Sequence, residues 1–189
     1  MAAPPPPAPP SPAAALLELL RRRESEMADL LAELARLESP SVVPAAQTPV
    51  LDRLAAELRA VGGLRVRRLR GKTSGGQLYA SAAPAGEMAR AKPRAAQLLL
   101  GHCDTVWPLG MLGEMPVERR DGNLYGPGVY DMKAGLVQGV FALRALRELR
   151  LEPRAAPVML INSDEEIGSV GRRPRAALAC QPQSSDHLR

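Results

Sequence analysis

Two short apolar runs, each followed directly by ionisable residues, constrain the fold of this chain more than any other feature. The run 97–100 leads into the segment 101–104 (GHCD), and the run 157–161 leads into 162–166 (NSDEE). Between them, apolar residues recur at helical spacing from about Met132 to Leu149. Buried strands that alternate with amphipathic helices are typical of α/β domains. We therefore predict an α/β fold with a largely parallel, mixed sheet flanked by helices, in which both runs are buried strands and the first is central.

The N-terminal part of the chain is expected to hold a tail and a helix. Residues 1–15 are almost wholly Ala and Pro, which predicts a disordered tail because such a segment has little to bury. The helical spacing of apolar residues then predicts one helix over 16–37. This helix is expected to end at Ser39-Pro40, since the residue before a proline is displaced from the helical region.

A second helix is expected directly afterwards. Thr48 is predicted to be its N-cap and Pro49 its first residue, and the glycines 62–63 are expected to end it. The remaining pattern predicts strands over 64–69 and 78–82, a loop over 86–94, and a turn at 121–122 between two short extended pieces.

Composition excludes several classes of function. The net charge of +5 is compatible with nucleic-acid binding, but aromatic residues make up only 3% of the chain and acidic residues are interleaved along most of it. No stretch approaches the roughly 18 consecutive apolar residues of a membrane span. The sequence starts without a basic segment followed by an apolar run, so a cytoplasmic location is expected. We predict neither a nucleic-acid partner nor a membrane partner.

The segment after the first apolar run places a histidine beside an aspartate. On an extended segment His102 and Asp104 share a face, and Cys103 points to the other side. A carboxylate beside an imidazole can fix its tautomer and support it as a metal ligand. The alternative is a histidine that is hydrogen-bonded for purely structural reasons.

Two other places supply carboxylates. Asp131 follows the glycines 126 and 128 at the start of a predicted helix, where it can be an N-cap, a metal ligand, or both. The run Asp164-Glu165-Glu166 directly follows the second strand; it is either a solvated acidic turn or a set of carboxylates that a cation holds together. Because ligands bind beyond the carboxyl ends of strands in open α/β sheets, we expect these groups to converge with the histidine.

Such a convergence would bring together one imidazole and several carboxylates. This donor set suits zinc in a hydrolytic site. A bound metal would lower the pKa of its water toward ~7 and polarise a carbonyl, while a carboxylate that is not a ligand serves as general base. The residues therefore predict metal-assisted hydrolysis.

Three segments also resemble, in order and spacing, the signatures of the dizinc metallopeptidases, the family of carboxypeptidase G, acetylornithine deacetylase, succinyl-diaminopimelate desuccinylase and aminoacylase. They are 98–106 (LLLGHCDTV), 124–135 (LYGPGVYDMKAG) and 162–169 (NSDEEIGS). The segment 38–41 (ESPS) is similar to the end of the family's opening helix. The residues that follow His102 are most similar to those of the glutamate carboxypeptidase branch. The resemblance covers roughly residues 27–171.

The resemblance implies a role for each matched residue. His102 would be the histidine ligand of one zinc ion, and Asp104 the carboxylate that orients it. Asp131 would bridge the two ions, Glu165 would be the general base, and Glu166 would bind the second ion. Two zinc ions are implied, with cobalt or manganese as substitutes, and the implied substrate is a small peptide or an N-acyl amino acid.

Parts of the family pattern have no match in this sequence. A further acidic ligand, a histidine near the C-terminus and the smaller domain through which the family often forms homodimers are all missing. We therefore predict that 16–171 is a partial, C-terminally truncated catalytic domain and that 172–189 is a divergent, disordered tail. The alternative to an active amide hydrolase is a catalytically incomplete fragment that binds metal weakly or not at all.

Overall fold

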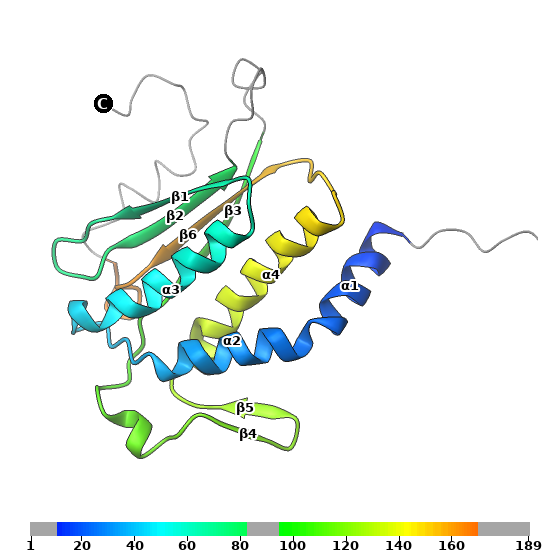
Figure 1. The fold of residues 1–189 in the computed structure, drawn as a ribbon. Coiled ribbons are helices and arrows are strands. Elements are labelled where there is room, and N and C mark those ends of the chain that lie inside the picture. The colour runs from blue at the N-terminus through cyan, green and yellow to red at the C-terminus, as the bar shows by residue number, and fades with distance from the viewer. Residues whose placement is uncertain (1–10, 83–94, 170–189) are drawn as a thin grey trace, which may run out of the picture.

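The computed structural model describes residues 11–82 and 95–169, which form a mixed sheet with helices packed on one of its faces (Figure 1). The helices are α1 (Pro12–Arg22), α2 (Glu24–Arg36), α3 (Gln47–Ala60) and α4 (Ala134–Glu148), with short turns η1 (Pro44–Ala46), η3 (Met111–Gly113) and η4 (Val129–Lys133). The strands are β1 (Leu64–Leu69), β2 (Gln77–Ala82), β3 (Ala96–His102), β4 (Glu118–Arg120), β5 (Asn123–Tyr125) and β6 (Ala156–Asn162). None of the described helices is long and apolar enough to cross a membrane.

The main sheet has the strand order β1-β2-β6-β3. β6 pairs parallel with β3 and antiparallel with β2, and β1 pairs antiparallel with β2. In the parallel pair His102 lies opposite Asn162, so the carboxyl ends of β3 and β6 coincide. The predicted α/β class with a mixed sheet is confirmed. The expectation that the sheet is largely parallel is wrong for the described strands, because only β3 and β6 pair in parallel. The register of this pair places the segments 103–105 and 163–166 at the same edge.

The prediction of a buried central strand at 97–100 is wrong in its position. Among the described strands β3 stands at the edge of the sheet, and β6 lies between two neighbours. The side chain of Leu100 is 56% exposed, whereas Leu160 and Ile161 on β6 are buried. Both runs are rich in apolar residues, and apolarity alone did not tell which strand has neighbours on both sides.

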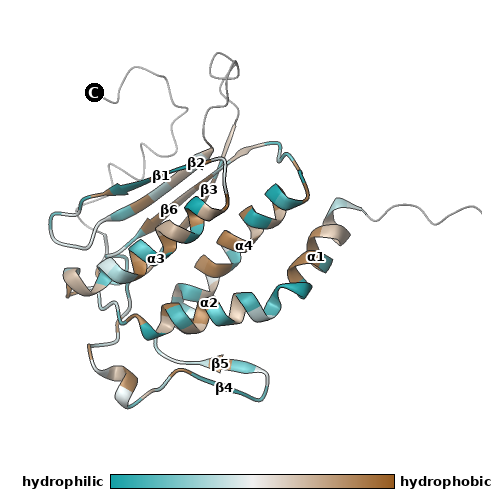
Figure 2. Cartoon of the chain, in the orientation of Figure 1, coloured by the Kyte–Doolittle hydropathy of each residue, from teal (hydrophilic) through white to brown (hydrophobic). Residues whose placement is uncertain are grey.

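The core lies between the sheet and the helices. α3 packs on β1 and β2, α4 packs on β3, and α1 and α2 pack on α4. Figure 2 shows that each of these helices carries both apolar and polar residues, as expected for amphipathic helices. Burial of a Leu or Phe side chain stabilises the fold by roughly 1.5–3 kcal/mol. The fully buried members of this core include Leu34, Leu51, Leu54, Leu58, Leu78, Leu136, Phe141 and Ile161.

The N-terminal predictions need two corrections. α1 begins at Pro12, capped by the Ser11 hydroxyl, which accepts a hydrogen bond from the Ala14 amide at 3.2 Å. The predicted tail over 1–15 therefore reaches too far; residues 1–10 lie outside the described residues. The predicted helix over 16–37 is two helices, because the backbone leaves the helical region at Arg23 (φ −100°, ψ 10°). The second of them ends at Arg36, ahead of the expected Ser39-Pro40.

The start of α3 also differs from its prediction. Thr48 is not the N-cap, because the turn η1 continues directly into a helix that begins at Gln47. Pro49 is tolerated within the first turn, where backbone N–H groups have no partner inside the helix. The predicted end of this helix is confirmed, since Gly62 and Gly63 have φ of 74° and 69°.

Two strands and a turn occur where the sequence predicts them. The strands expected over 64–69 and 78–82 are confirmed as β1 and β2. The turn expected at 121–122 joins β4 to β5, and both of its residues have positive φ. The loop expected over 86–94 and the tail expected over 172–189 lie outside the described residues.

Candidate metal centre

His102 is the last residue of β3, and its imidazole is nearly buried. Its Nδ1 lies 3.0 Å from the backbone oxygen of Asp104. Because a carbonyl oxygen only accepts, Nδ1 carries a hydrogen and Nε2 is left to face the carboxylates. Nε2 lies 3.1 Å from Oδ1 of Asp131 and 3.8 Å from Oε2 of Glu165. The histidine therefore presents one nitrogen to the acidic residues, as a metal ligand must.

Two opposing effects set the protonation of His102. Burial disfavours the imidazolium, but hydrogen bonds and negative charge from Asp104, with a contribution from Glu165, outweigh it and raise the pKa to about 9. Without a metal, the imidazolium is the favoured form at neutral pH. A cation that binds at Nε2 must displace that proton.

Asp104 is fully buried directly below the imidazole. Its Oδ2 accepts hydrogen bonds from the Ser41 hydroxyl at 2.7 Å and from the Glu166 amide at 3.2 Å. Burial alone would raise the pKa of Asp104, but the neighbouring His102 imidazole together with hydrogen bonds from Ser41 and from backbone amides after β6 lowers it below its usual value. The buried carboxylate is therefore held in its ionised form.

The predicted pairing of His102 with Asp104 is present in an altered form. The shorter contact to Nδ1 comes from the Asp104 backbone oxygen, and the carboxylate Oδ1 lies 3.5 Å away. Cys103 points to the other side, as expected, and is buried in the core beneath the helices. Burial raises the pKa of its thiol, so Cys103 is not an activated nucleophile.

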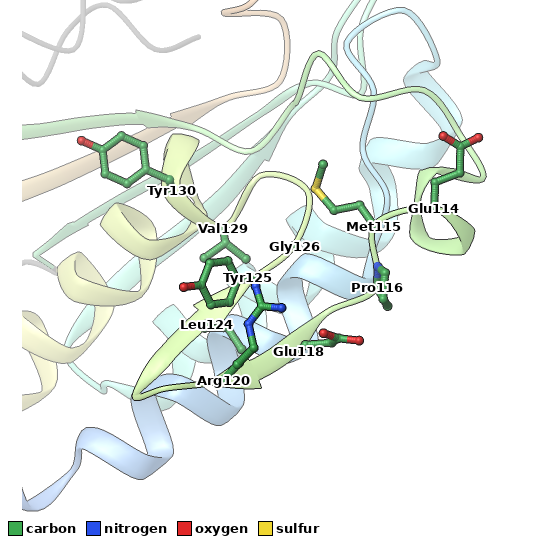
Figure 3. Close-up of a pocket in the computed structure, with 10 residues that line it drawn as sticks. All are labelled: Glu114, Met115, Pro116, Glu118, Arg120, Leu124, Tyr125, Gly126, Val129 and Tyr130. Carbon is green, nitrogen blue, oxygen red and sulfur yellow. The ribbon is translucent and has the colours of Figure 1, made fainter.

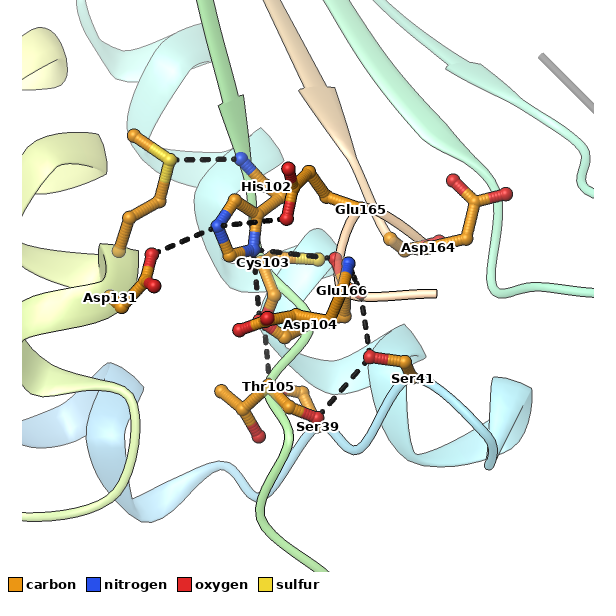
Figure 4. Close-up of polar contacts among 12 residues, drawn as sticks. Ser39, Ser41, His102, Cys103, Asp104, Thr105, Asp131, Asp164, Glu165 and Glu166 are labelled. Atoms are coloured by element: carbon orange, nitrogen blue, oxygen red, sulfur yellow. Dashed lines mark hydrogen bonds and ion pairs between the residues drawn. The ribbon is translucent and has the colours of Figure 1, made fainter. Parts of the chain in front are cut away.

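Asp131 lies in η4, between β5 and α4. Its interpretation as an N-cap is wrong, because α4 begins at Ala134 and Asp131 has an extended backbone (φ −114°, ψ 104°). Its carboxylate turns to His102 instead (Figure 4). The preceding turn needs Gly128, which has a φ of 68° and where an added Cβ would lie 2.5 Å from Cγ2 of Thr105.

The three acidic residues after β6 separate into different environments. Asp164 is buried, Glu166 is half-buried, and the Glu165 side chain is 56% exposed. Desolvation raises the pKa of Glu166, although the positive charge of His102 opposes this. The alternative of a uniformly solvated acidic turn is therefore wrong.

A cation fits this cluster. One ligand atom each from His102, Asp131 and Glu166 lies within 4.8 Å of the other two. One nitrogen and two carboxylate oxygens match a catalytic zinc site, in which three protein ligands leave a fourth position open. The convergence of strand ends expected from the sequence is thus observed, while the roles assigned to the individual residues stay predictions.

A cavity of about 450 Å³ is lined by the β4–β5 hairpin and by the residues on either side of it, and none of the candidate ligands lines it (Figure 3). Tyr130, at its margin, is 95% exposed and directly precedes Asp131. Within the cavity wall the Arg120 guanidinium lies over the Tyr125 ring, 4.7 Å from its centroid. The wall combines apolar side chains with both signs of charge.

Two polar groups near this centre have a place in the structure that was not predicted from the sequence. Ser41 bonds to Asp104 across a separation of 63 residues. Lys133 is buried, and its Nζ donates to the Leu37 carbonyl at 2.8 Å. The family-like ESPS and DMKA segments contain both residues, but no local pattern indicates such distant partners.

Known proteins share similarity with this chain in both structure and sequence. The structure of human carnosine dipeptidase 1 superposes with a TM-score of 0.73 at 20% identity, over 89% of this chain and 38% of that one. This likeness shows that the chain has the fold of the matching part of that protein. A family model described as Peptidase family M20/M25/M40 matches residues 98–186.

Two curated relatives match a shorter segment. Carboxypeptidase G2 of Pseudomonas sp. (strain RS-16) is 37% identical over 76 residues, which are 40% of this chain and 18% of the relative. Succinyl-diaminopimelate desuccinylase of Verminephrobacter eiseniae (strain EF01-2) is 42% identical over 76 residues, 37% of this chain and 18% of the relative. The predicted resemblance to the metallopeptidases is confirmed. The chain spans about a fifth of the length of these relatives.

Proposed function

We propose that this chain carries part of the active site of a zinc-dependent hydrolase that cleaves the amide bond of a C-terminal amino acid or of an N-acyl amino acid. The observation that carries the proposal is the meeting of ligand atoms from His102, Asp131 and Glu166 within 4.8 Å, next to the carboxylate of Glu165. The similarity to carboxypeptidase G2 and to succinyl-diaminopimelate desuccinylase supports this class of reaction.

His102, Asp131 and Glu166 would hold the ion, and Asp104 would orient the imidazole. A zinc ion held there supplies Lewis-acid polarisation of a carbonyl and a water of lowered pKa. Two zinc ions, with Asp131 between them, follow from the family resemblance, and cobalt or manganese would suit the same donors.

Glu165 is proposed as the general base. Its Oε2 lies 3.8 Å from Nε2 of His102, and its carboxylate is exposed enough to meet a substrate. It does not belong to the group of three ligand atoms, so it is available to accept a proton from the attacking water. The same carboxyl can then return that proton to the leaving amine.

The proposed substrate is a small peptide or an N-acyl amino acid, and the proposed setting is the cytoplasm. A homodimer follows from the family resemblance alone. Neither a nucleic acid nor a membrane is proposed as a partner, because basic and acidic residues are mixed along the sequence and aromatic residues are rare.

A second candidate is a catalytically incomplete chain that binds metal weakly. The described residues contribute three ligand atoms to the group, fewer than two zinc ions require.

The test compares the wild type with Glu165→Gln after loading with zinc, using N-acyl amino acids and C-terminal glutamate conjugates as substrates. The proposal predicts metal-dependent hydrolysis that falls about 10²- to 10⁴-fold in Glu165→Gln while metal content is unchanged. Glu166→Gln is the matched control, because it should lower metal content as well. Metal binding without turnover in the wild type would support the incomplete chain, and turnover without metal would refute the proposal.

A further inference from the structure

The linker between α2 and α3 is packed against the segment that follows β3. The Thr105 amide donates to the Ser39 carbonyl at 2.9 Å, and the Ser41 amide donates to the Thr105 carbonyl at 3.1 Å. Pro40 and Thr105 thereby form an isolated parallel bridge. The linker thus extends the pairing beyond the end of β3, directly beneath the candidate metal centre.

The two serines of this linker make different contacts although both are buried. Ser39 is fully buried and its hydroxyl donates to the Cys103 carbonyl at 2.7 Å. Ser41 is 4% exposed and its hydroxyl donates to Oδ2 of Asp104, also at 2.7 Å (Figure 4). The Ser39 hydroxyl contacts only the backbone. The Ser41 hydroxyl also lies 3.3 Å from the Thr105 carbonyl, but its shorter contact is to a carboxylate that contacts the candidate ligands.

Asp104 connects the ends of the two parallel strands. On the β3 side its Oδ1 lies 3.5 Å from Nδ1 of His102, and on the β6 side its Oδ2 accepts the Glu166 amide. Rotation of the Asp104 carboxylate would therefore disturb the imidazole and the Glu166 backbone together. The torsion of an aspartate carboxylate is broad by itself, so an external hydrogen bond has to set it. Besides the Glu166 amide, Ser41 provides such a hydrogen bond, the shorter of the two, from a third element of the fold.

We propose that Ser41 is a positioning residue of the metal centre, which acts through Asp104 on His102 and Glu166. The inference rests on the proposed function to the extent that these two residues bind the ion. Groups that orient metal ligands from outside typically change metal affinity 10- to 100-fold when they are removed. Ser41 donates to the carboxylate, and Ser39 does not.

The test measures zinc affinity by competition with a chelating indicator, using the full chain. Ser41→Ala is expected to weaken zinc binding about 10- to 100-fold and to change the absorption spectrum of bound Co²⁺. Ser39→Ala removes a buried hydrogen bond of the same length from the same linker, so it is the matched control. It should lower the melting temperature but keep the zinc affinity and the Co²⁺ spectrum of the wild type. Ser41→Thr, which keeps a hydroxyl, should restore binding.

Wild-type zinc affinity in Ser41→Ala, or an equal loss of affinity in both alanine variants, would overturn the inference. If Ser41→Ala does not fold, Ser41→Cys takes its place, because a thiol of similar size is a weak donor; unchanged zinc affinity there also overturns it. A wild type that binds no zinc removes the metal centre, and with it both this inference and the proposed function. A wild type that binds zinc without hydrolysing any substrate counts against the proposed function alone, and the affinities still decide the role of Ser41.

Discussion

Lys133 allows a sharp test of the physical account of this fold, because it is a lysine that the protein buries almost completely. Its side chain is 1% exposed and its Nζ has the Leu37 carbonyl as a hydrogen-bond acceptor. Burial disfavours the ammonium and lowers the pKa from 10.5 to about 8, although the negative charge of Glu38 opposes this. Replacement by methionine keeps much of the side-chain volume and removes the titration.

The sign of the effect follows from proton counting. Between pH 8 and 10.5 the unfolded chain holds the Lys133 proton and the native chain has released it, so the free energy of unfolding rises with pH in this window. The difference between the two pKa values corresponds to about 3 kcal/mol, a penalty that is fully present below pH 8 and absent above 10.5. Removing the penalty in Lys133→Met is offset at pH 7 by the loss of a partner for the Leu37 carbonyl, which costs about 1–3 kcal/mol.

The assay is urea denaturation of the wild type and Lys133→Met at intervals from pH 7 to 10.5. We expect similar stabilities near pH 7 and a gap that grows by about 3 kcal/mol in favour of the wild type as the pH rises. Every other ionisable group is present in both proteins, so the difference between the two profiles isolates Lys133. Lys72→Met, at an exposed lysine, is the matched control and should keep the wild-type profile. A gap that stays constant with pH would refute the reasoning.

Two further predictions concern the metal centre. Gly128→Ala should lower both zinc affinity and the melting temperature, because the added Cβ would lie 2.5 Å from Cγ2 of Thr105. Gly122→Ala is the control: Gly122 also has a positive φ (74°), but no atom lies within 4 Å of the added Cβ, so zinc affinity should change little. Equal losses of affinity in the two variants would contradict this prediction. Zinc binding must displace a proton from His102, whose pKa is about 9, so the affinity measured by competition should rise roughly tenfold per pH unit from 7 to 9. A flat profile would show that the imidazole is not a ligand.

The parts of the fold that sequence predicts well are those with a local signal. The buried stripe of α3 at Leu51, Leu54 and Leu58 follows from helical spacing, and β6 follows from its apolar run. The convergence of His102 with Glu166 was also predictable, because both follow strands whose carboxyl ends share one edge of a parallel pair.

The parts that sequence could not predict depend on distant partners. β6 takes its place in the sheet by pairing with segments about 60 or more residues away, so the sequence of β3 alone did not indicate its edge position. The same holds for Ser41, because its hydroxyl is one of two in the linker and nothing local indicates that the fold brings Asp104 to it. At Asp131 two local interpretations were compatible, and only the backbone of η4 separated them.

The position of β6 between β2 and β3 has a consequence for how the chain is made. Synthesis delivers segments in order, so β1, β2 and β3 leave the ribosome before the strand that joins them. The β1–β2 hairpin can close early. In the described sheet β3 pairs with β6 alone, so until β6 has been made the edges of β3 are open to association with other chains. When β6 arrives it completes the sheet and carries Glu166 to His102 in the same event. The proposed ligands of a nascent chain therefore meet at the same moment as β6 covers this exposed edge of β3.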